Sequence, residues 1–346
     1  MSLSRIRVAL LGCGRISRKH FDAFESNATD VELVAVCDID RAALDAAVTR
    51  TKARGFESLE QLISWGEFEL LVIATPSGLH ARQAIRAASA GFNVITEKPM
   101  ATRWSDGKEM VARFDQAERS LFVVKQNRFN GPVQRVKNAI STGRFGRIYM
   151  ITANVFWCRP QAYYDSAPWR GTWEFDGGAF MNQASHYVDL MDWLGGPVES
   201  VQAFTATLAR AIEVEDTGTV SIKWRSGCLG SLNVTTLASP RDLEGSITIV
   251  GEKGTAKIGG VALNEMLQWE FMESREEDAA ALASGYATKS VYGFSHSIFY
   301  ENVIKSLRGE EKALVSGREG LRSLELLTAI YQSARDGRRV SLPLEH

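Results

Sequence analysis

A glycine-rich turn near the amino terminus restricts the possible folds of this chain more than any other feature. Residues 5–12 form a short apolar run that predicts a strand, and Gly12-Cys13-Gly14-Arg15-Ile16-Ser17 completes it. The next segment, 15–25, has helical character. A strand, a tight glycine turn and a helix in this order are typical of the first unit of a dinucleotide-binding sheet, here with serine at the third small position.

Asp38 supports this interpretation and indicates which dinucleotide is bound. It follows the second apolar run, 31–37, at the place where the ribose of the adenosine is expected. A carboxylate there repels a 2′-phosphate, so we predict NAD rather than NADP. Arg41 is close enough in sequence to reach such a phosphate in principle. A turn or cap role for Asp38 is the alternative.

Further cofactor contacts are expected where the following strands end. Thr75-Pro76-Ser77 comes after the apolar run 70–74, at the edge where a doubly wound sheet opens its ligand crevice. We expect His80 to contact the cofactor but not to take part in catalysis. A surface position on the next helix is the alternative. The expected cofactor residues are Gly12, Gly14, Arg15, Ile16, Asp38, Thr75, Pro76, Ser77, His80, Glu97, Lys98 and Gln126.

The order of the predicted strands and helices changes near residue 125 and indicates a domain boundary there. Before it, apolar strands alternate with helices, as in a parallel sheet buried on both faces. After it, short strands follow one another through tight turns. We predict an α/β fold class: an N-terminal doubly wound Rossmann domain, 1–125, plus a C-terminal α+β domain with a mostly antiparallel open sheet, 126–343. In the second domain we expect strands at 148–157, 198–208, 217–224, 228–236, 245–250 and 254–258, and helices at 178–194, 295–307 and 317–336.

Composition excludes several classes of function. The chain has 40 basic and 41 acidic residues and a net charge of −1, so no global field attracts a nucleic acid. The cysteines are widely spaced and form no zinc pattern, which favours a reducing compartment. No run approaches the roughly 20 apolar residues that cross a bilayer, and we expect a cytoplasmic protein. Leu344-Glu345-His346 is typical of a vector remnant ahead of a histidine tag.

Glu97-Lys98-Pro99, at the end of the strand predicted at 92–96, gives the fingerprint a family context. Together with Gly177-Gly178 and His186-Tyr187-Val188-Asp189, it resembles the glucose-fructose oxidoreductase/inositol dehydrogenase (Gfo/Idh/MocA) family over essentially the whole chain. The resemblance implies that the Glu-Lys-Pro turn lies beside the nicotinamide and that its proline bond is often cis. It also implies NAD-dependent oxidation of a sugar-like alcohol by a homo-oligomer, a tetramer.

A finer resemblance points to one branch of that family. Its basis is Gln126-Asn127-Arg128-Phe129-Asn130, the arginine-bearing aromatic loop within 157–173, and Met181-Asn182-Gln183-Ala184-Ser185-His186. Members of the branch oxidise the 3-hydroxyl of a UDP-linked N-acetylglucosaminuronate for surface polysaccharide biosynthesis. Some regenerate NAD by reducing 2-oxoglutarate, so 2-oxoglutarate is an expected co-substrate.

Oxidation of an alcohol requires a base for the hydroxyl proton, and Lys98 and His186 are the candidates. The positive nicotinamide ring and partial burial both favour the neutral lysine amine. Asn182 lies four residues before His186, so on one helix the two side chains would face one ligand. Many relatives carry aspartate at Asn182. Because that charge is missing here, we rank Lys98 above His186. The two polar groups make an incomplete metal site, and we predict no metal.

The loop 157–173 is rich in tryptophan, tyrosine and arginine and is poorly suited to a core. Arg159 and Arg170 suit bidentate binding of a carboxylate or pyrophosphate, and the rings suit stacking on a sugar or base. An aromatic arm packed on another subunit is the alternative. The expected substrate residues are Asn127, Arg159, Tyr163, Trp169, Arg170, Asn182, Gln183 and His186.

Two other functions compete with the nucleotide-sugar hypothesis. A dehydrogenase of a free sugar or inositol in the same family would offer no anion for the arginines of the loop. A non-catalytic, NAD-sensing regulator would not require Lys98 and His186, which are both present.

Overall fold

The computed structural model describes residues 4–288 and 293–344 and divides the chain into two compact units. The first contains Met1–Lys125 and Phe294–Leu324, and the second contains Gln126–Gly293 and Glu325–His346. The segment 294–324, which the sequence predicted in the second domain, therefore packs with the first. Glu345 and His346, part of the suspected vector remnant, lie outside the described residues.

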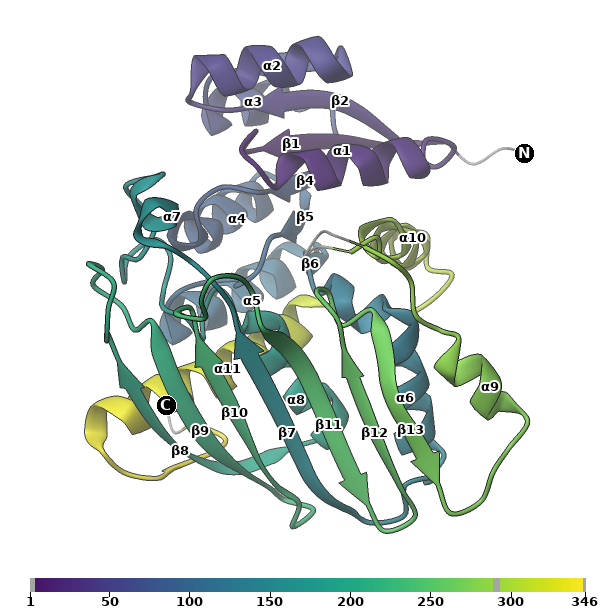
Figure 1. Cartoon of the computed structure of the whole chain (residues 1–346). Coiled ribbons are helices and arrows are strands. Elements are labelled where there is room, and N and C mark those ends of the chain that lie inside the picture. Colours follow the sequence, from purple (N-terminus) through teal and green to yellow (C-terminus); the bar gives the residue numbers. More distant parts are fainter. Residues whose placement is uncertain (1–3, 289–292, 345–346) are drawn as a thin grey trace. The chain divides into compact units, whose positions relative to one another are not determined.

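The first unit is built on a six-stranded parallel sheet of order β3-β2-β1-β4-β5-β6 (Figure 1). Its strands are β1 (Ile6–Leu11), β2 (Val31–Cys37), β3 (Arg54–Phe56), β4 (Leu70–Ile73), β5 (Asn93–Thr96) and β6 (Leu121–Val123). Its helices are α1 (Ser17–Ser26), α2 (Arg41–Thr51), α3 (Leu59–Trp65), α4 (His80–Ser89), α5 (Trp104–Ala117) and α10 (His296–Leu307), with the start of α11 (Gly317–Asp336). This is the predicted doubly wound sheet.

In this strand order the topological switch point, where the order of the strands reverses, lies between β1 and β4. All residues of β4 are fully buried, because helices cover both faces of a parallel sheet. The carboxyl ends of β1 and β4 therefore open side by side, where a doubly wound sheet binds its ligand. The predicted strand at 31–37 and helix at 317–336 have the expected bounds.

The segment that returns to the first unit packs through α10 and the start of α11. Helix α10 lies against α1, and Ser316 forms a bridge with Phe122 of β6. The sequence predicted both helices correctly. It did not predict where they pack, because an amphipathic pattern shows which face is buried and not which sheet covers it.

The second unit contains an eight-stranded sheet of order β13-β12-β11-β7-β10-β9-β8-β14. Its strands are β7 (Ile148–Phe156), β8 (Val198–Ala206), β9 (Thr217–Trp224), β10 (Leu229–Thr235), β11 (Glu244–Gly251), β12 (Gly254–Gly259), β13 (Glu265–Phe271) and β14 (Val340–Ser341). The pairs are antiparallel except β7–β10, which confirms the mostly antiparallel prediction. The sequence missed β13, whose pairing shifts register between Lys257 and Ile258 and whose polar residues obscure the alternation.

One face of this sheet is covered and the other is open. Helices α6 (Gly131–Ser141) and α8 (Ser185–Gly195) lie behind it (Figure 1), and the shorter helices of the unit are α7 (Gln161–Asp165) and α9 (Glu277–Leu282). Strand β9 shows the alternation, with Val220, Ile222 and Trp224 buried and residues 219, 221 and 223 exposed. Over the described ranges, no helix is long and apolar enough to cross a membrane.

The expected helix at 178–194 begins later than predicted. Residues 178–184 form turns, in which Asn182 N–H donates to the Gly178 carbonyl, and α8 starts at Ser185. The argument that Asn182 and His186 share a helical face is therefore wrong. The two glycines at 177 and 178 favour turns over a helix.

Candidate active site

The glycine turn has the geometry that the fingerprint predicts. Gly12 has a φ of +98°, and a Cβ at this position would lie 2.7 Å from the Ala74 carbonyl group. The loops that follow β1 and β4 therefore touch at the topological switch point, and a side chain at Gly12 would separate them. A Cβ at Gly14, in contrast, would meet nothing within 4 Å. The space above Gly14 fits a group from outside the chain, as a pyrophosphate requires.

The start of α1 can bind an anion. Its N-cap, Ile16, offers no side-chain hydrogen bond, and the described first turn holds no acidic residue. Helix α2 differs, since the Asp40 side chain accepts hydrogen bonds from Ala42 and Ala43 N–H. The first N–H groups of α1 and its positive dipole end therefore suit the phosphates of a dinucleotide.

Asp38 lies at the end of β2 and holds the turn. Its Oδ2 accepts the Cys13 N–H at 2.6 Å, and its Oδ1 accepts the Asp40 N–H at 2.8 Å. The structural role that the sequence gave as an alternative is therefore present. It does not exclude the ribose contact, because each carboxylate oxygen has a second acceptor position.

Two neighbours of Asp38 bear on the choice of dinucleotide. The Arg41 guanidinium is engaged by Asp45, at 3.0 Å, and by Glu57. It is therefore less available for a 2′-phosphate than its sequence position suggested. Ile39 is 91% exposed, an apolar side chain beside the expected ribose site that the sequence did not single out. Its position favours packing on a flat ring such as adenine.

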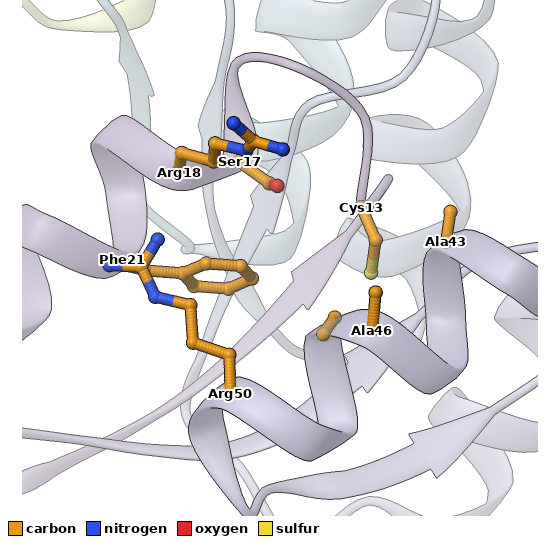
Figure 2. Close-up of a pocket in the computed structure, with 8 residues that line it drawn as sticks. Cys13, Ser17, Arg18, Phe21, Ala43, Ala46 and Arg50 are labelled. Atoms are coloured by element: carbon orange, nitrogen blue, oxygen red, sulfur yellow. The ribbon is translucent and has the colours of Figure 1, made fainter.

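A pocket of about 450 Å³ lies between α1 and α2 (Figure 2). Cys13, Ser17, Arg18 and Phe21 line it on one side, and alanines of α2 with Arg50 line it on the other. Cys13 and Ser17 belong to the fingerprint, so the pocket adjoins the glycine turn, although Gly14, Asp38 and the loop after β4 are not part of its lining.

The loop after β4 is braced from inside the unit. His80 is buried, with Nδ1 2.8 Å from the Pro99 carbonyl oxygen and Nε2 2.8 Å from that of Thr75. Burial lowers its pKa. His80 is thus not a surface residue: its ring joins the Thr75-Pro76-Ser77 loop to the Glu97-Lys98-Pro99 turn. Its ring nitrogens face the backbone, so a direct cofactor contact is not favoured.

The Glu97-Lys98-Pro99 turn follows β5, with a cis Lys98–Pro99 bond. Lys98 is half-buried and Glu97 is buried. Glu97 Oε2 accepts the Lys98 N–H at 3.1 Å, and Oε1 lies 3.2 Å from Nε2 of His20. Burial alone would raise the Glu97 pKa, but the contact with His20 outweighs it, and the pKa falls to about 2. The Glu97 side chain points into the unit, so its expected cofactor contact would come from its backbone.

In the second unit, Gln126 and His186 meet. Gln126 Nε2 lies 3.2 Å from His186 Nε2. The elements that carry them are joined by Arg128 and Asp189, whose bidentate ion pair has distances of 2.9 and 2.7 Å and is fully buried. Arg128 and Asp189 belong to two of the sequence motifs, but the sequence did not predict their ion pair. Opposite charges in two site motifs were the signal that could have identified this pair.

Asn182 and Gln183 lie in the turns before α8. Asn182 Nδ2 donates to Oδ1 of Asp176, a buried carboxylate whose Oδ2 accepts the Gly171 N–H at 2.8 Å. Asp176, which the sequence did not single out, therefore places a carboxylate beside Asn182. Gln183 is buried, as is Asn127, and within the described ranges Asn127 Oδ1 has no hydrogen-bond partner.

The two arginines of the aromatic loop have different surroundings. Arg159 forms an ion pair with Asp242 at 3.0 Å. Arg170 lies 4.4 Å from the ring centres of both Tyr163 and Trp169 and donates to the Tyr163 hydroxyl at 2.7 Å. In the part of the chain that the structure describes, Arg170 Nε is buried without a hydrogen-bond partner. Arg170 is therefore better placed than Arg159 to bind an anion from outside the chain.

These features are typical of a dinucleotide-binding oxidoreductase that carries a second α+β unit. Residues 6–125 match the family model described as oxidoreductase family, NAD-binding Rossmann fold, and residues 137–342 match the C-terminal alpha/beta domain of the same family. The chain belongs to the Gfo/Idh/MocA oxidoreductase family and is an NAD-dependent dehydrogenase.

Several relatives match over nearly the full chain. The D-apiose dehydrogenase of Paraburkholderia graminis is 27% identical and covers 99% of this chain and 91% of its own length. A solved WlbA dehydrogenase from Chromobacterium violaceum, in complex with NADH and UDP-GlcNAcA, is 61% identical, with a TM-score of 0.95 and coverage of 100% of this chain and 98% of its own. The Bordetella pertussis WlbA dehydrogenase, in complex with the same ligands, is 58% identical, with a TM-score of 0.97 and full coverage of both chains.

Proposed function

We propose that this enzyme oxidises the 3-hydroxyl of a UDP-linked N-acetylglucosaminuronate during the biosynthesis of a surface polysaccharide. The observation that carries the proposal is the similarity over the whole chain to two dehydrogenases solved with NADH and UDP-GlcNAcA. The stacked Arg170 supports it, because a uronate carboxylate or a diphosphate is the anion that a guanidinium between aromatic rings would bind.

The residues divide the reaction between them. Lys98 is the primary base for the hydroxyl proton, and His186, beside Gln126, is the second proton acceptor. Asn182, fixed by Asp176, and the buried amides Asn127 and Gln183 orient the sugar. Bound NAD supplies the hydride acceptor.

The anion and the rings of the substrate are assigned to the aromatic loop. Arg170 binds the carboxylate or the diphosphate, and Tyr163 and Trp169 stack on the sugar or the base. Arg159 has a lesser part, because Asp242 already neutralises it.

The decisive experiment supplies the purified protein with NAD and UDP-GlcNAcA, with and without 2-oxoglutarate. We expect a 3-keto sugar product, accompanied by NADH when 2-oxoglutarate is absent or by recycling of NAD when it is present. Absence of product, together with turnover of D-apiose or an inositol, would transfer the assignment to free sugars. No turnover of any of these would favour an NAD-sensing regulator.

Lys98→Ala tests the base in the same assay. Removal of a general base typically lowers the rate about 10²- to 10⁴-fold, so we expect turnover to fall to that extent while NAD binding stays within about threefold of the wild type. Lys52→Ala, at an exposed position after α2, is the matched control and should retain full activity. A Lys98→Ala variant with a near wild-type rate would remove the lysine from the reaction.

We also propose a homo-oligomer that pairs through the open face of the eight-stranded sheet, with a tetramer as the expected form. Met150, Leu229 and Val250, which are 45%, 52% and 36% exposed, form an apolar row on that face. The cytoplasm remains the proposed location, on the cysteine usage described above.

A further inference from the structure

A buried polar network lies behind the Glu97-Lys98 segment and has no part in the reaction as proposed. It joins three elements of the first unit, with His20 on α1, Glu97 at the end of β5 and Tyr300 on α10. His20 and Tyr300 have no exposed surface. Polar groups buried so completely are usually there because their hydrogen bonds are made within the protein.

His20 lies between Tyr300 and Glu97 and contacts both. His20 Nδ1 lies 2.8 Å from the Tyr300 hydroxyl. Burial raises the pKa of Tyr300 well above its ordinary value, so the hydroxyl keeps its proton and can donate it to Nδ1. The other ring nitrogen of His20, Nε2, lies at ion-pair distance, 3.2 Å, from Glu97 Oε1. The other carboxylate oxygen accepts the Lys98 N–H at 3.1 Å. The chain of contacts thus runs from Tyr300 to the backbone of the proposed base.

Other ionisable groups also act on Glu97 or on the histidines beside it. His296, on α10, has its ring centre 5.9 Å from that of His20, and burial lowers its pKa to about 3, so it is neutral at neutral pH. His80 lies within electrostatic range, and burial lowers its pKa too. Lys98 contributes a positive charge that stabilises the Glu97 carboxylate. Lys19 and Asp22 act on His296 with opposite signs.

We propose that His20 is a positioning residue for Lys98: it anchors the buried Glu97 carboxylate, which fixes the lysine backbone and keeps a negative charge beside the lysine amine. The interaction is mutual, because a carboxylate that is stabilised by an ammonium group stabilises that ammonium group equally. His20 touches neither the substrate nor the cofactor in this scheme. The inference rests on the proposed function only where it calls Lys98 the base.

A merely structural role is the competing explanation. His20 and Tyr300 also join α1 to α10, so their loss could lower stability without any effect on the lysine. Activity alone cannot separate the two explanations, since both lower it. The protonation of the Lys98 amine separates them, because it responds to the charge of Glu97 and not to stability.

The test measures the acetylation of Lys98 by acetic anhydride as a function of pH, without NAD or sugar, by peptide mass spectrometry. The exposed Lys52 is the internal reference. Only a neutral amine reacts. In Glu97→Gln the carboxylate charge is gone, and in His20→Leu the buried carboxylate loses its partner and takes up a proton. In both variants we expect the labelling curve of Lys98 to move to lower pH, with about threefold more label at a fixed pH on the rising part.

Two variants keep the test decisive if His20→Leu does not fold. His20→Gln retains a donor for Glu97 and an acceptor for Tyr300, so its curve should lie close to the wild type. Tyr300→Phe removes only the hydroxyl, and its curve should move in the same direction as that of Glu97→Gln. A Lys98 curve that is unchanged in Glu97→Gln and in the folded network variants would overturn the inference. Labelling needs no turnover, so a failure of Lys98 as base in the sugar assay leaves this result independent.

Discussion

The Asp38 carboxylate holds the turn, and in the proposed ribose contact it also sets the choice of cofactor. Asp38→Ser should relax the discrimination against NADP at least about tenfold, because the repulsion of the 2′-phosphate is lost, and should also weaken NAD binding, because the Cys13 N–H loses its acceptor. Titration of both cofactors measures the two effects. Asp40→Ser is the matched control, since serine also caps α2 and the Asp38 contacts remain. Equal cofactor preference in Asp38→Ser and the wild type would contradict the ribose assignment.

At the residue scale, sequence could predict what depends on neighbours in the chain. The positive φ at Gly12 follows from the short passage from strand to helix, and the turn role of Asp38 was an alternative from the start. The buried position of His80 was not predictable, because it depends on a contact with the Pro99 carbonyl in a different loop. The partner of Glu97 was missed for the same reason. His20 lies on the helix of the fingerprint, and only the folded sheet brings the two together.

At the scale of elements, Glu215 links the turns before α8 to α11 and makes stability depend on pH. It accepts the Phe180 N–H at 2.9 Å and the Tyr331 hydroxyl at 2.9 Å. A Cβ on Gly178 would lie 1.6 Å from its Oε2, so a side chain there would displace the carboxylate. Burial raises the pKa of Glu215 from 4.5 to about 7. The folded state therefore binds the proton more tightly, and the stabilisation is complete below pH 4.5 and lost as the pH rises through 7.

Glu215→Gln should remove this dependence. As the pH rises from 4.5 to above 7, ionisation of this group should lower the free energy of unfolding of the wild type by on the order of 3 kcal/mol. The neutral variant should not show this loss. Urea unfolding of both proteins at pH 5 and pH 8 measures the difference. Glu213→Gln, at an exposed position nearby, is the control and should keep the wild-type dependence. Parallel pH dependences for Glu215→Gln and the wild type would show that the carboxyl is ionised in the folded state at both pH values.

Elements with a strong period were predictable, and those that depend on tertiary contacts were not. The strand at 217–224 alternates buried and exposed residues without interruption, so its bounds were correct. The turns at 178–184 were predicted as helix, because their apolar residues fit a helical period while Glu215 and Asp176 hold them in turns.

At the scale of the whole molecule, the change of pattern near residue 125 was local and visible. The return of 294–324 to the first unit was not, because packing against α1 and β6 leaves no periodic signal.

The proposed oligomer would pair through the open sheet face, where three neighbouring strands present one apolar row. Met150 pairs with Leu229 on one side and Val250 on the other, so a charge at Met150 falls within the row. Met150→Lys should therefore reduce the mass of the particle in solution, measured by light scattering on a sizing column, while NAD binding by the first unit is retained. Leu282→Lys introduces the same charge at an apolar residue of α9 that is 54% exposed and should leave the mass unchanged. A wild-type monomer at micromolar concentration would refute the oligomer, whereas a Met150→Lys variant of wild-type mass would place the contact on another face.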